Sequence, residues 1–180
     1  MDAAAAADVR FRDAAPTATD AAALADIGTR TFVATFGHLY GAGDLAAFLA
    51  ADHSPAAAAR LLARPGVHVR FALHAGTVAG YAVVAPNALP HVPADVRAAE
   101  LKRLYLLADL MGRGVADQLM DWAQGVARAA GHDAMTLSVF SANHRAKRFY
   151  ARHGFTHLGD YLFMVGTHAD LEHVWMKRLA

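Results

Sequence analysis

The 180-residue sequence contains no cysteine, which excludes disulfides, thiolate metal sites and a cysteine nucleophile. This composition suits a reducing, cytoplasmic setting. An excess of charge of one sign is also missing, because 17 Lys and Arg against 16 Asp and Glu give a formal net charge of +1. Without a basic field, the chain is not expected to bind nucleic acid.

Long apolar runs are absent too. The longest are short and are interrupted by Asp, Arg or His, so no membrane span is predicted. The first eight residues are an alanine run between two aspartates, without the basic start and bulky apolar core of a secretory signal. We therefore expect residues 1–7 to form a frayed tail on a cytoplasmic protein that does not bind membranes.

Hydrophobic periodicity predicts the order strand, helices, two-strand hairpin, strand, helix, strand, helix, strand, strand. The residues expected to cap helix starts are Thr17, Asp44, Ser54 and Asn143. The hairpin is expected to turn at 74–77, and 88–95 is expected to be a loop with two prolines. This order, without repeat or linker, predicts one α/β or α+β domain over residues 1–180 with a largely central sheet.

Two glycines, Gly112 and Gly114, separate a predicted strand over 99–107 from a predicted helix over 114–130. Glycines at such a junction let backbone N–H groups surround an anion, to which the helix dipole adds, and a pyrophosphate is the natural guest. Arg113 would supply a further cation. A short Gly-x-Gly also fits a plain strand-to-helix turn, and its spacing matches neither the Rossmann fingerprint nor a nucleotide P-loop.

The next predicted helix carries a second motif. Its members Asn143, Ala146, Phe149 and Tyr150 step by three and four residues, so they are expected to share one helical face. A tyrosine on that face can donate a proton to a leaving group. The same tyrosine can equally be a packed aromatic whose hydroxyl finds a partner.

Together, these motifs resemble the GNAT superfamily of N-acyltransferases. The family motif Arg/Gln-x-x-Gly-x-Gly/Ala is similar to 111–116, and Asn-x-x-Ala-x-x-Phe-Tyr-x-x-x-Gly-Phe is present in full over 143–155. The strand over 100–107 is similar to the family's cofactor-side strand. The resemblance implies an acetyltransferase with a central mixed, mostly antiparallel sheet, flanked by helices and with a V-shaped splay between two central strands.

The resemblance also implies roles for individual residues. Acetyl-CoA would be the co-substrate and no metal would be needed. The residues expected to bind the cofactor are Leu104, Tyr105, Leu106, Met111, Gly112, Arg113, Gly114, Val115, Ala116 and Asn143. Tyr150 would protonate the leaving thiolate, and Glu100 would be the base that neutralises the amine; a solvated strand-end carboxylate is the competing interpretation of Glu100. Met111 departs from the family, because its side chain cannot bind phosphate as Arg or Gln would.

Other polar residues are harder to assign from the sequence. His38 and His91 fall in regions that border the acceptor in this family, although scattered surface histidines are the simpler interpretation. The histidines at 144, 153 and 157 are not spaced for a metal site on one face. The basic residues of 145–152 are typical of a solvated helix face, and some of them could meet the CoA 3′-phosphate.

A softer resemblance, over 35–40, 104–105 and 159–166, links the chain to a bacterial branch with polyamine acetyltransferase-like members. It implies a small-molecule primary amine as acceptor, in an acidic pocket for which the candidates are Asp44, Asp52, Asp95 and Glu100. Direct attack in a ternary complex is expected, because no cysteine can take the acyl group. The alternatives are acetylation of a protein N-terminus or lysine, and a non-catalytic acyl-CoA sensor. The closing strands allow a homodimer.

Overall fold

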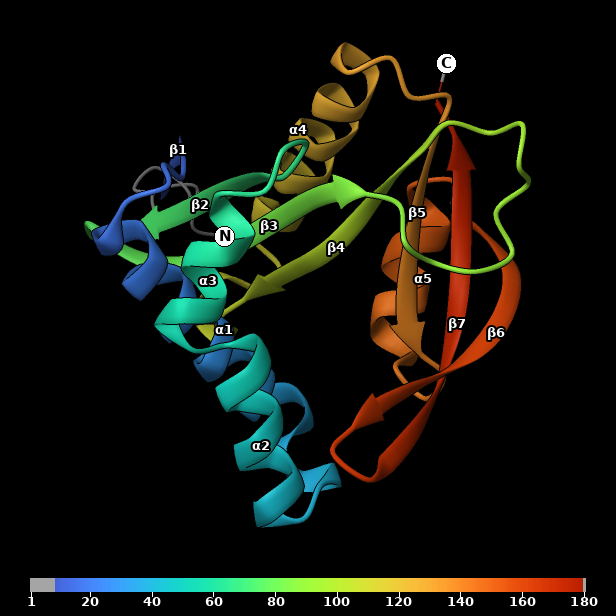
Figure 1. Cartoon of the computed structure of the whole chain (residues 1–180). Coiled ribbons are helices and arrows are strands. Elements are labelled where there is room, and N and C mark those ends of the chain that lie inside the picture. Colours follow the sequence, from blue (N-terminus) through green and yellow to red (C-terminus); the bar gives the residue numbers. More distant parts are fainter. Residues whose placement is uncertain (1–8, 180) are drawn as a thin grey trace.

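The computed structural model describes residues 9–179, and its centre is a seven-stranded sheet (Figure 1). The strands are β1 (Val9–Asp13), β2 (His68–His74), β3 (Thr77–Pro86), β4 (Ala98–Leu106), β5 (Ala134–Phe140), β6 (Thr156–Val165) and β7 (His168–Arg178). Their spatial order is β1-β2-β3-β4-β5-β7-β6. Every neighbouring pair is antiparallel except β4 and β5. The prediction of a mixed, mostly antiparallel sheet is confirmed; the tail expected at 1–7 lies outside the described residues.

The parallel pair β4 and β5 separates soon after it begins. Its register joins residues 98–100 of β4 to 134–136 of β5, and no pairing between them follows Glu100 and Thr136. Figure 1 shows the two strands diverging from that end of the sheet. The rest of β4 pairs only with β3 on its other side. The predicted splay is therefore present, and it leaves one edge of β4 open.

The helices are α1 (Ala18–Phe36), α2 (Ala42–Asp52), α3 (Pro55–Leu62), α4 (Val115–Ala129) and α5 (His144–Arg152), with short 3-10 turns η1 (Gly37–Leu39) and η2 (Ala108–Leu110). Within 9–179, no helix is long and apolar enough to cross a membrane. The predicted order of elements is confirmed.

Two apolar layers cover opposite faces of the sheet. Alternation along β3 sends Tyr81 and Val83 to one face and Ala82 and Val84 to the other. The first face packs against α1 and α3, and the second packs against α4. The sheet is thus held between helices, as the α/β class requires.

Three of the four expected helix caps are confirmed. The side chains of Thr17, Ser54 and Asn143 accept hydrogen bonds from backbone N–H groups three residues on. The prediction for Asp44 is wrong, because α2 begins two residues earlier, after Gly41. The Asp44 carboxylate instead accepts hydrogen bonds from the backbone N–H and the hydroxyl of Thr167. A tertiary contact to the β6–β7 turn has replaced the local cap.

Candidate active site

A cavity of about 580 Å³ lies in the splay. Its lining comes from α1 and α2, from β4 and β5 on the two sides of the splay, and from α5, β6 and β7. Of the residues predicted for the site, the structure brings together Glu100, Leu104, Tyr105, Leu106, Met111, Ala116, Asn143 and Tyr150 in this lining. The residues from Gly112 to Val115 are not part of it. The lining therefore joins both sequence motifs in one space.

The unpaired edge of β4 lines part of the cavity. Residues 104–106 pair with 80–82 of β3, and their other edge has no strand partner. Gly80 favours this close packing, since a Cβ there would stand 3.0 Å from the Tyr105 carbonyl oxygen. An extended chain can hydrogen-bond to such an edge as an added strand does.

The glycine turn leads from η2 into α4. Gly112 and Gly114 have φ of 78° and 74°, the left-handed region that favours glycine. Gly114 is the residue that precedes the first turn of α4, and Val115 anchors that turn in the core with 1% of its surface exposed. One detail differs from expectation: the Met111 N–H donates to the Ala108 carbonyl at 3.1 Å, so this turn, and not an anion, satisfies it.

The predicted face of α5 points into the cavity. Its members Asn143, Ala146, Phe149 and Tyr150 all line it. Asn143 caps the helix by accepting the Ala146 N–H at 3.1 Å. At the other end, both Arg152 and His153 bind the Asp117 carboxylate of α4, at 2.7 and 2.8 Å. The two helices that carry the motifs are thereby fixed to each other.

Tyr150 is the tyrosine of that face. Burial raises the pKa of its phenol well above the usual range, and the negative charge of Glu172 adds to the shift. The hydroxyl therefore keeps its proton at neutral pH. It can donate a hydrogen bond to an atom that becomes negative nearby.

Glu100 lies where the parallel pairing of β4 and β5 ends. Its side chain is buried, with 6% of the residue exposed. One carboxylate oxygen accepts the Ala88 N–H at 3.2 Å, and the other lies 3.8 Å from the Lys102 ammonium. It is thus a partnered carboxylate in the cavity wall and not a solvated strand end.

Glu172 on β7 is a cavity residue that the sequence analysis missed. Burial raises the pKa of its carboxyl to about 7, the Asp170 charge adds to the shift, and a hydrogen bond from Ser138 opposes it. The Tyr161 hydroxyl donates in turn to the Ser138 hydroxyl at 3.1 Å. A signal existed in the sequence: Asp170, Glu172 and Val174 alternate along the last strand, so two carboxylates share a face with a core valine.

Both acidic and basic side chains line the cavity. The carboxylates are Asp52, Glu100, Asp170 and Glu172, and the cations are Lys102, Arg103 and Arg145. Lys102 lies 3.8 Å from Glu100, and Arg103 lies 3.9 Å from Asp52. Of the four acidic residues suggested by the sequence, Asp52 and Glu100 are therefore in the wall. Asp44 is engaged at the β6–β7 turn, and Asp95 is exposed in the 87–97 loop. Neither of these two lines the cavity.

The histidine in the cavity lining is not one of the two that the sequence suggested. His38 and His91 are not in the lining, and the His91 Nε2 lies 2.8 Å from the Asp160 carbonyl. His53, which the sequence analysis did not single out, does line the cavity. Burial lowers the pKa of His53 to about 3, with Arg103 adding to the shift, so its imidazole is neutral at pH 7.

Of the basic residues on α5, Arg145 lines the cavity. The Lys147 ammonium donates to the Ser141 carbonyl at 2.6 Å, and Arg152 binds Asp117. These two cations are therefore already partnered. Arg145 is the member of this group best situated to meet a phosphate on a ligand in the cavity.

Comparison with known proteins gives a consistent result. The acetyltransferase (GNAT) family model matches residues 32–155. An uncharacterized N-acetyltransferase of Mycobacterium tuberculosis is 34% identical over 161 residues, covering 89% of this chain and 99% of the relative. The aminoalkylphosphonate N-acetyltransferase of Salmonella typhimurium is 35% identical over 91 residues, 51% of this chain and 58% of that protein.

Solved structures share the fold. The PaiA N-acetyltransferase of Thermoplasma acidophilum, in complex with coenzyme A, superposes with a TM-score of 0.73 at 17% identity, covering 94% of this chain and 98% of that one. A GCN5-related N-acetyltransferase from Rhodopseudomonas palustris gives a TM-score of 0.71 at 21% identity, with 94% and 95% covered.

Proposed function

Because this chain belongs to the acetyltransferase (GNAT) family, we propose that it transfers acetyl from acetyl-CoA to a primary amine of a small molecule or polyamine. The family makes it an acyltransferase enzyme. The observation that carries the proposal is the cavity itself, which is lined by the open edge of β4, by Tyr150 and by four carboxylates.

The residues present fit coenzyme A. The open edge of Leu104, Tyr105 and Leu106 would hydrogen-bond the pantetheine arm, and the turn from Gly112 to Ala116 at the start of α4 would hold the pyrophosphate. Left-handed glycines leave room for phosphate close to the backbone, and a Cβ at Gly112 or Gly114 would meet nothing within 4 Å. The PaiA relative holds coenzyme A in the same fold. When bound, acetyl-CoA supplies the thioester carbonyl that the amine attacks.

Two carboxylates can take the amine proton. Glu100 is the residue expected from the resemblance, and Glu172 is the one with a pKa of about 7. A base is most effective when its pKa lies near the working pH, so we assign proton acceptance to Glu172, directly or through one water. Ser138 and Tyr161 fix its orientation. Glu100 then contributes negative charge that attracts the ammonium form of the acceptor.

Tyr150 completes the reaction. The neutral amine nitrogen forms a bond to the carbonyl carbon, the carbon–sulfur bond breaks, and the departing thiolate takes the Tyr150 proton. The resulting tyrosinate recovers a proton from the nitrogen of the new amide, directly or through water. The products are the N-acetyl amide and free coenzyme A. Since the chain has no cysteine, the transfer is direct and occurs in a ternary complex.

Closure of the acceptor side supports a small substrate. Asp44 of α2 binds Thr167 in the β6–β7 turn, Tyr40 binds Asp170, and the rings of Phe48 and Phe163 meet edge to face at 5.9 Å. Figure 1 shows the tip of the β6–β7 hairpin reaching the end of α1 and the start of α2. A polypeptide substrate needs an open groove there, whereas a small cationic amine fits a closed acidic wall.

The β6–β7 hairpin also carries exposed apolar side chains, and on this ground the proposal includes a homodimer. Leu162, Met164 and Leu171 are 63%, 52% and 45% exposed. Leu162 pairs with Leu171 across the two strands, and Met164 follows two residues on. Light scattering on the full chain tests whether this apolar stripe holds two copies together.

Calorimetric titration with acetyl-CoA, followed by a thiol-release assay over a panel of diamines, monoamines and peptides, tests the function. The proposal predicts saturable binding and release with small amines, diamines foremost. Release with peptides alone would favour a protein N-terminal or lysine acetyltransferase. Binding without release on any amine would favour a non-catalytic sensor.

A further inference from the structure

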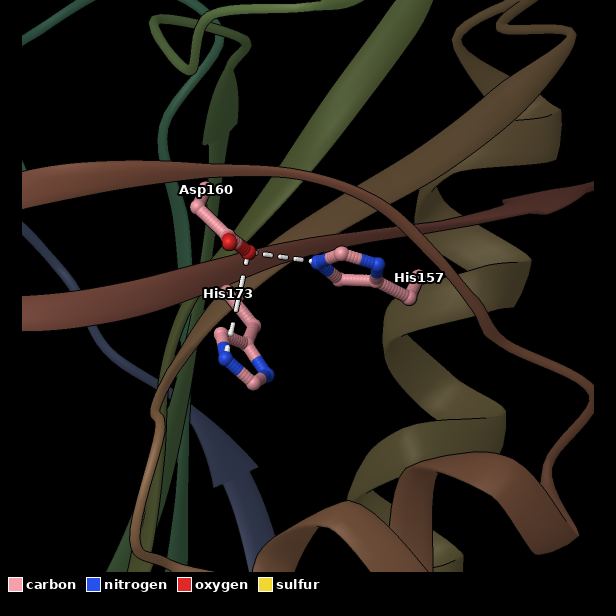
Figure 2. A group of neighbouring side chains, drawn as sticks. All are labelled: His157, Asp160 and His173. Carbon is pink, nitrogen blue, oxygen red and sulfur yellow. Dashed lines mark hydrogen bonds and ion pairs between the residues drawn. The ribbon is translucent and has the colours of Figure 1, made fainter.

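Two histidines and an aspartate converge on the closing strands, away from the acetyl-transfer residues. The three are His157, Asp160 and His173, and their ligand atoms all lie within 4.8 Å of one another. Figure 2 shows both imidazole rings directed at the Asp160 carboxylate. The His157 Nε2 lies 2.6 Å, and the His173 Nε2 3.8 Å, from the Asp160 Oδ1.

A β-bulge creates this convergence. In a regular strand, residues 157 and 160 would point to opposite faces, because their separation is odd. The β6–β7 register, however, joins His157 to Trp175, Gly159 to Val174 and Asp160 to His173, so Leu158 is an extra residue. All three side chains are thereby turned to the same face. Bulges that redirect a side chain in this way are characteristic of functional positions.

A second contact holds the backbone at Asp160. The His91 Nε2 lies 2.8 Å from the Asp160 carbonyl oxygen. Gly159 permits this approach, since a Cβ there would stand 2.6 Å from the His91 ring. The loop over 87–97 is thus held against the strand beside Asp160.

We propose that His157, Asp160 and His173 bind a first-row transition-metal dication of the zinc type. Two imidazole nitrogens and one carboxylate oxygen suit Zn²⁺, Co²⁺ or Ni²⁺, and water would fill the remaining positions. With metal–ligand bonds of about 2.0–2.1 Å, tetrahedral ligand atoms lie roughly 3.3 Å apart. The 2.6 Å pair would therefore open and the 3.8 Å pair would close by less than about 1 Å each. The two imidazole nitrogens, which lie within 4.8 Å of each other, would close by up to about 1.5 Å.

Asp160 supplies the negative charge that a metal cation needs in this cluster. Lys147 is a positive charge near His173. The Lys147 ammonium itself is bound to the Ser141 carbonyl. The metal would take the place of the contact that the His157 Nε2 now makes with the Asp160 carboxylate at 2.6 Å.

The site lies apart from the acetyl-transfer chemistry. Tyr161 and Glu172, the next residues along the two strands, pair with each other and line the cavity. Alternation therefore sends Asp160 and His173 to the opposite face. Bound metal would link β6 to β7 and stabilise the hairpin whose other face carries Glu172.

Calorimetry with Zn²⁺ and visible absorption with Co²⁺, both on the untagged, EDTA-treated full chain, test the proposal. We expect one equivalent to bind and the melting temperature to rise with it. His157→Gln and His173→Ala should each weaken binding at least tenfold, while His68→Ala, an exposed histidine on β2, should leave it unchanged. His157→Gln is the safeguard against misfolding, because that side chain is 48% exposed. Absence of saturable binding, or equal affinity in the His157 and His68 variants, would overturn the assignment.

Discussion

The Tyr40 hydroxyl donates a hydrogen bond of 2.5 Å to the Asp170 carboxylate, joining residues 130 positions apart in the chain. Tyr40 follows α1 and η1, and Asp170 lies on β7. The bond therefore joins the segment after α1 to the last strand. Burial first, and then this bond and the nearby carboxylates, raise the pKa of the phenol far above its usual range. The donor proton is therefore present throughout the physiological range.

Tyr40→Phe should lower the free energy of unfolding by about 1–3 kcal/mol, because it removes a hydrogen bond to a buried carboxylate. Asp170 is 4% exposed and would keep only His168, whose Nε2 lies 3.2 Å away. Urea unfolding measures the change. Asp170→Asn, which retains an acceptor for the Tyr40 hydroxyl, should cost less than Asp170→Ala. If Tyr40→Phe lowers the free energy of unfolding by less than about 0.5 kcal/mol, the bond does not stabilise the contact between the segment after α1 and β7.

Glu172→Gln should remove a pH dependence from both rate and stability. With an acceptor amine that is already neutral, kcat/KM of the wild type should rise with pH through about 7 as Glu172 loses its proton. In Glu172→Gln it should be flat and about 10²-fold lower. Glu100→Gln is the matched control and should keep the rise. If the rise is lost in Glu100→Gln and kept in Glu172→Gln, the base is Glu100.

The raised pKa of the Glu172 carboxyl also makes the free energy of unfolding depend on pH. The folded-state pKa of about 7 lies above the ordinary value of 4.5, so between these values the native state holds a proton that the unfolded state has released. The free energy of unfolding should therefore fall as pH rises from 4.5 to 7, by up to about 3 kcal/mol from this group. Urea unfolding of Glu172→Gln across that range should show a flatter curve. Parallel curves for the two proteins would contradict the raised pKa.

Gly114→Asp should abolish acetyl-CoA binding while α4 remains folded. Asp and Asn both tolerate the left-handed conformation that Gly114 has at φ 74°, so Gly114→Asn isolates the charge. Like charges a few ångströms apart near a surface repel by about 4 kcal/mol, and a tenfold loss needs only about 1.4 kcal/mol. Calorimetry should give an affinity at least about tenfold lower for Asp than for Asn. Equal affinities would mean that the phosphate site lies elsewhere.

Met111→Arg should strengthen acetyl-CoA binding by about three- to tenfold. Met111 lines the cavity with 37% of its surface exposed, and its apolar side chain makes no polar contact to a phosphate. An arginine there adds a charge-assisted hydrogen bond, worth about 0.5–1.5 kcal/mol at a solvated position. Met111→Leu is the control and should match the wild type. A Met111→Arg affinity no higher than that of Met111→Leu would show that this side chain points away from the phosphates.

The arrangement of the two motifs could be predicted from sequence because its signals are local. The glycine turn leads into α4, and the face of Asn143, Ala146, Phe149 and Tyr150 follows from helical spacing within one short helix. The caps at Thr17 and Ser54 depend on three-residue contacts and were predicted for the same reason.

The rest of the cavity is assembled by contacts between distant segments. Alternation places Asp170, Glu172 and Val174 on one face of β7, but the sequence does not show that β7 pairs with β5 and β6, and this pairing brings that face to the cavity. The sequence predicts Asp44 as a helix cap, because its actual partner, Thr167, lies 123 residues away and leaves no local pattern. The bulge at Leu158 likewise depends on the register with β7, so the histidine cluster could not be foreseen.

The central claim is that acetyl transfer occurs beside Tyr150, and the most direct test measures kcat and acetyl-CoA affinity for Tyr150→Phe on the same preparation. We predict a kcat lower by about 10²-fold or more, with acetyl-CoA affinity within about twofold of the wild type. Tyr81→Phe, a buried tyrosine outside the cavity lining, serves as the control and should keep the wild-type kcat. An unchanged kcat in Tyr150→Phe would contradict the account.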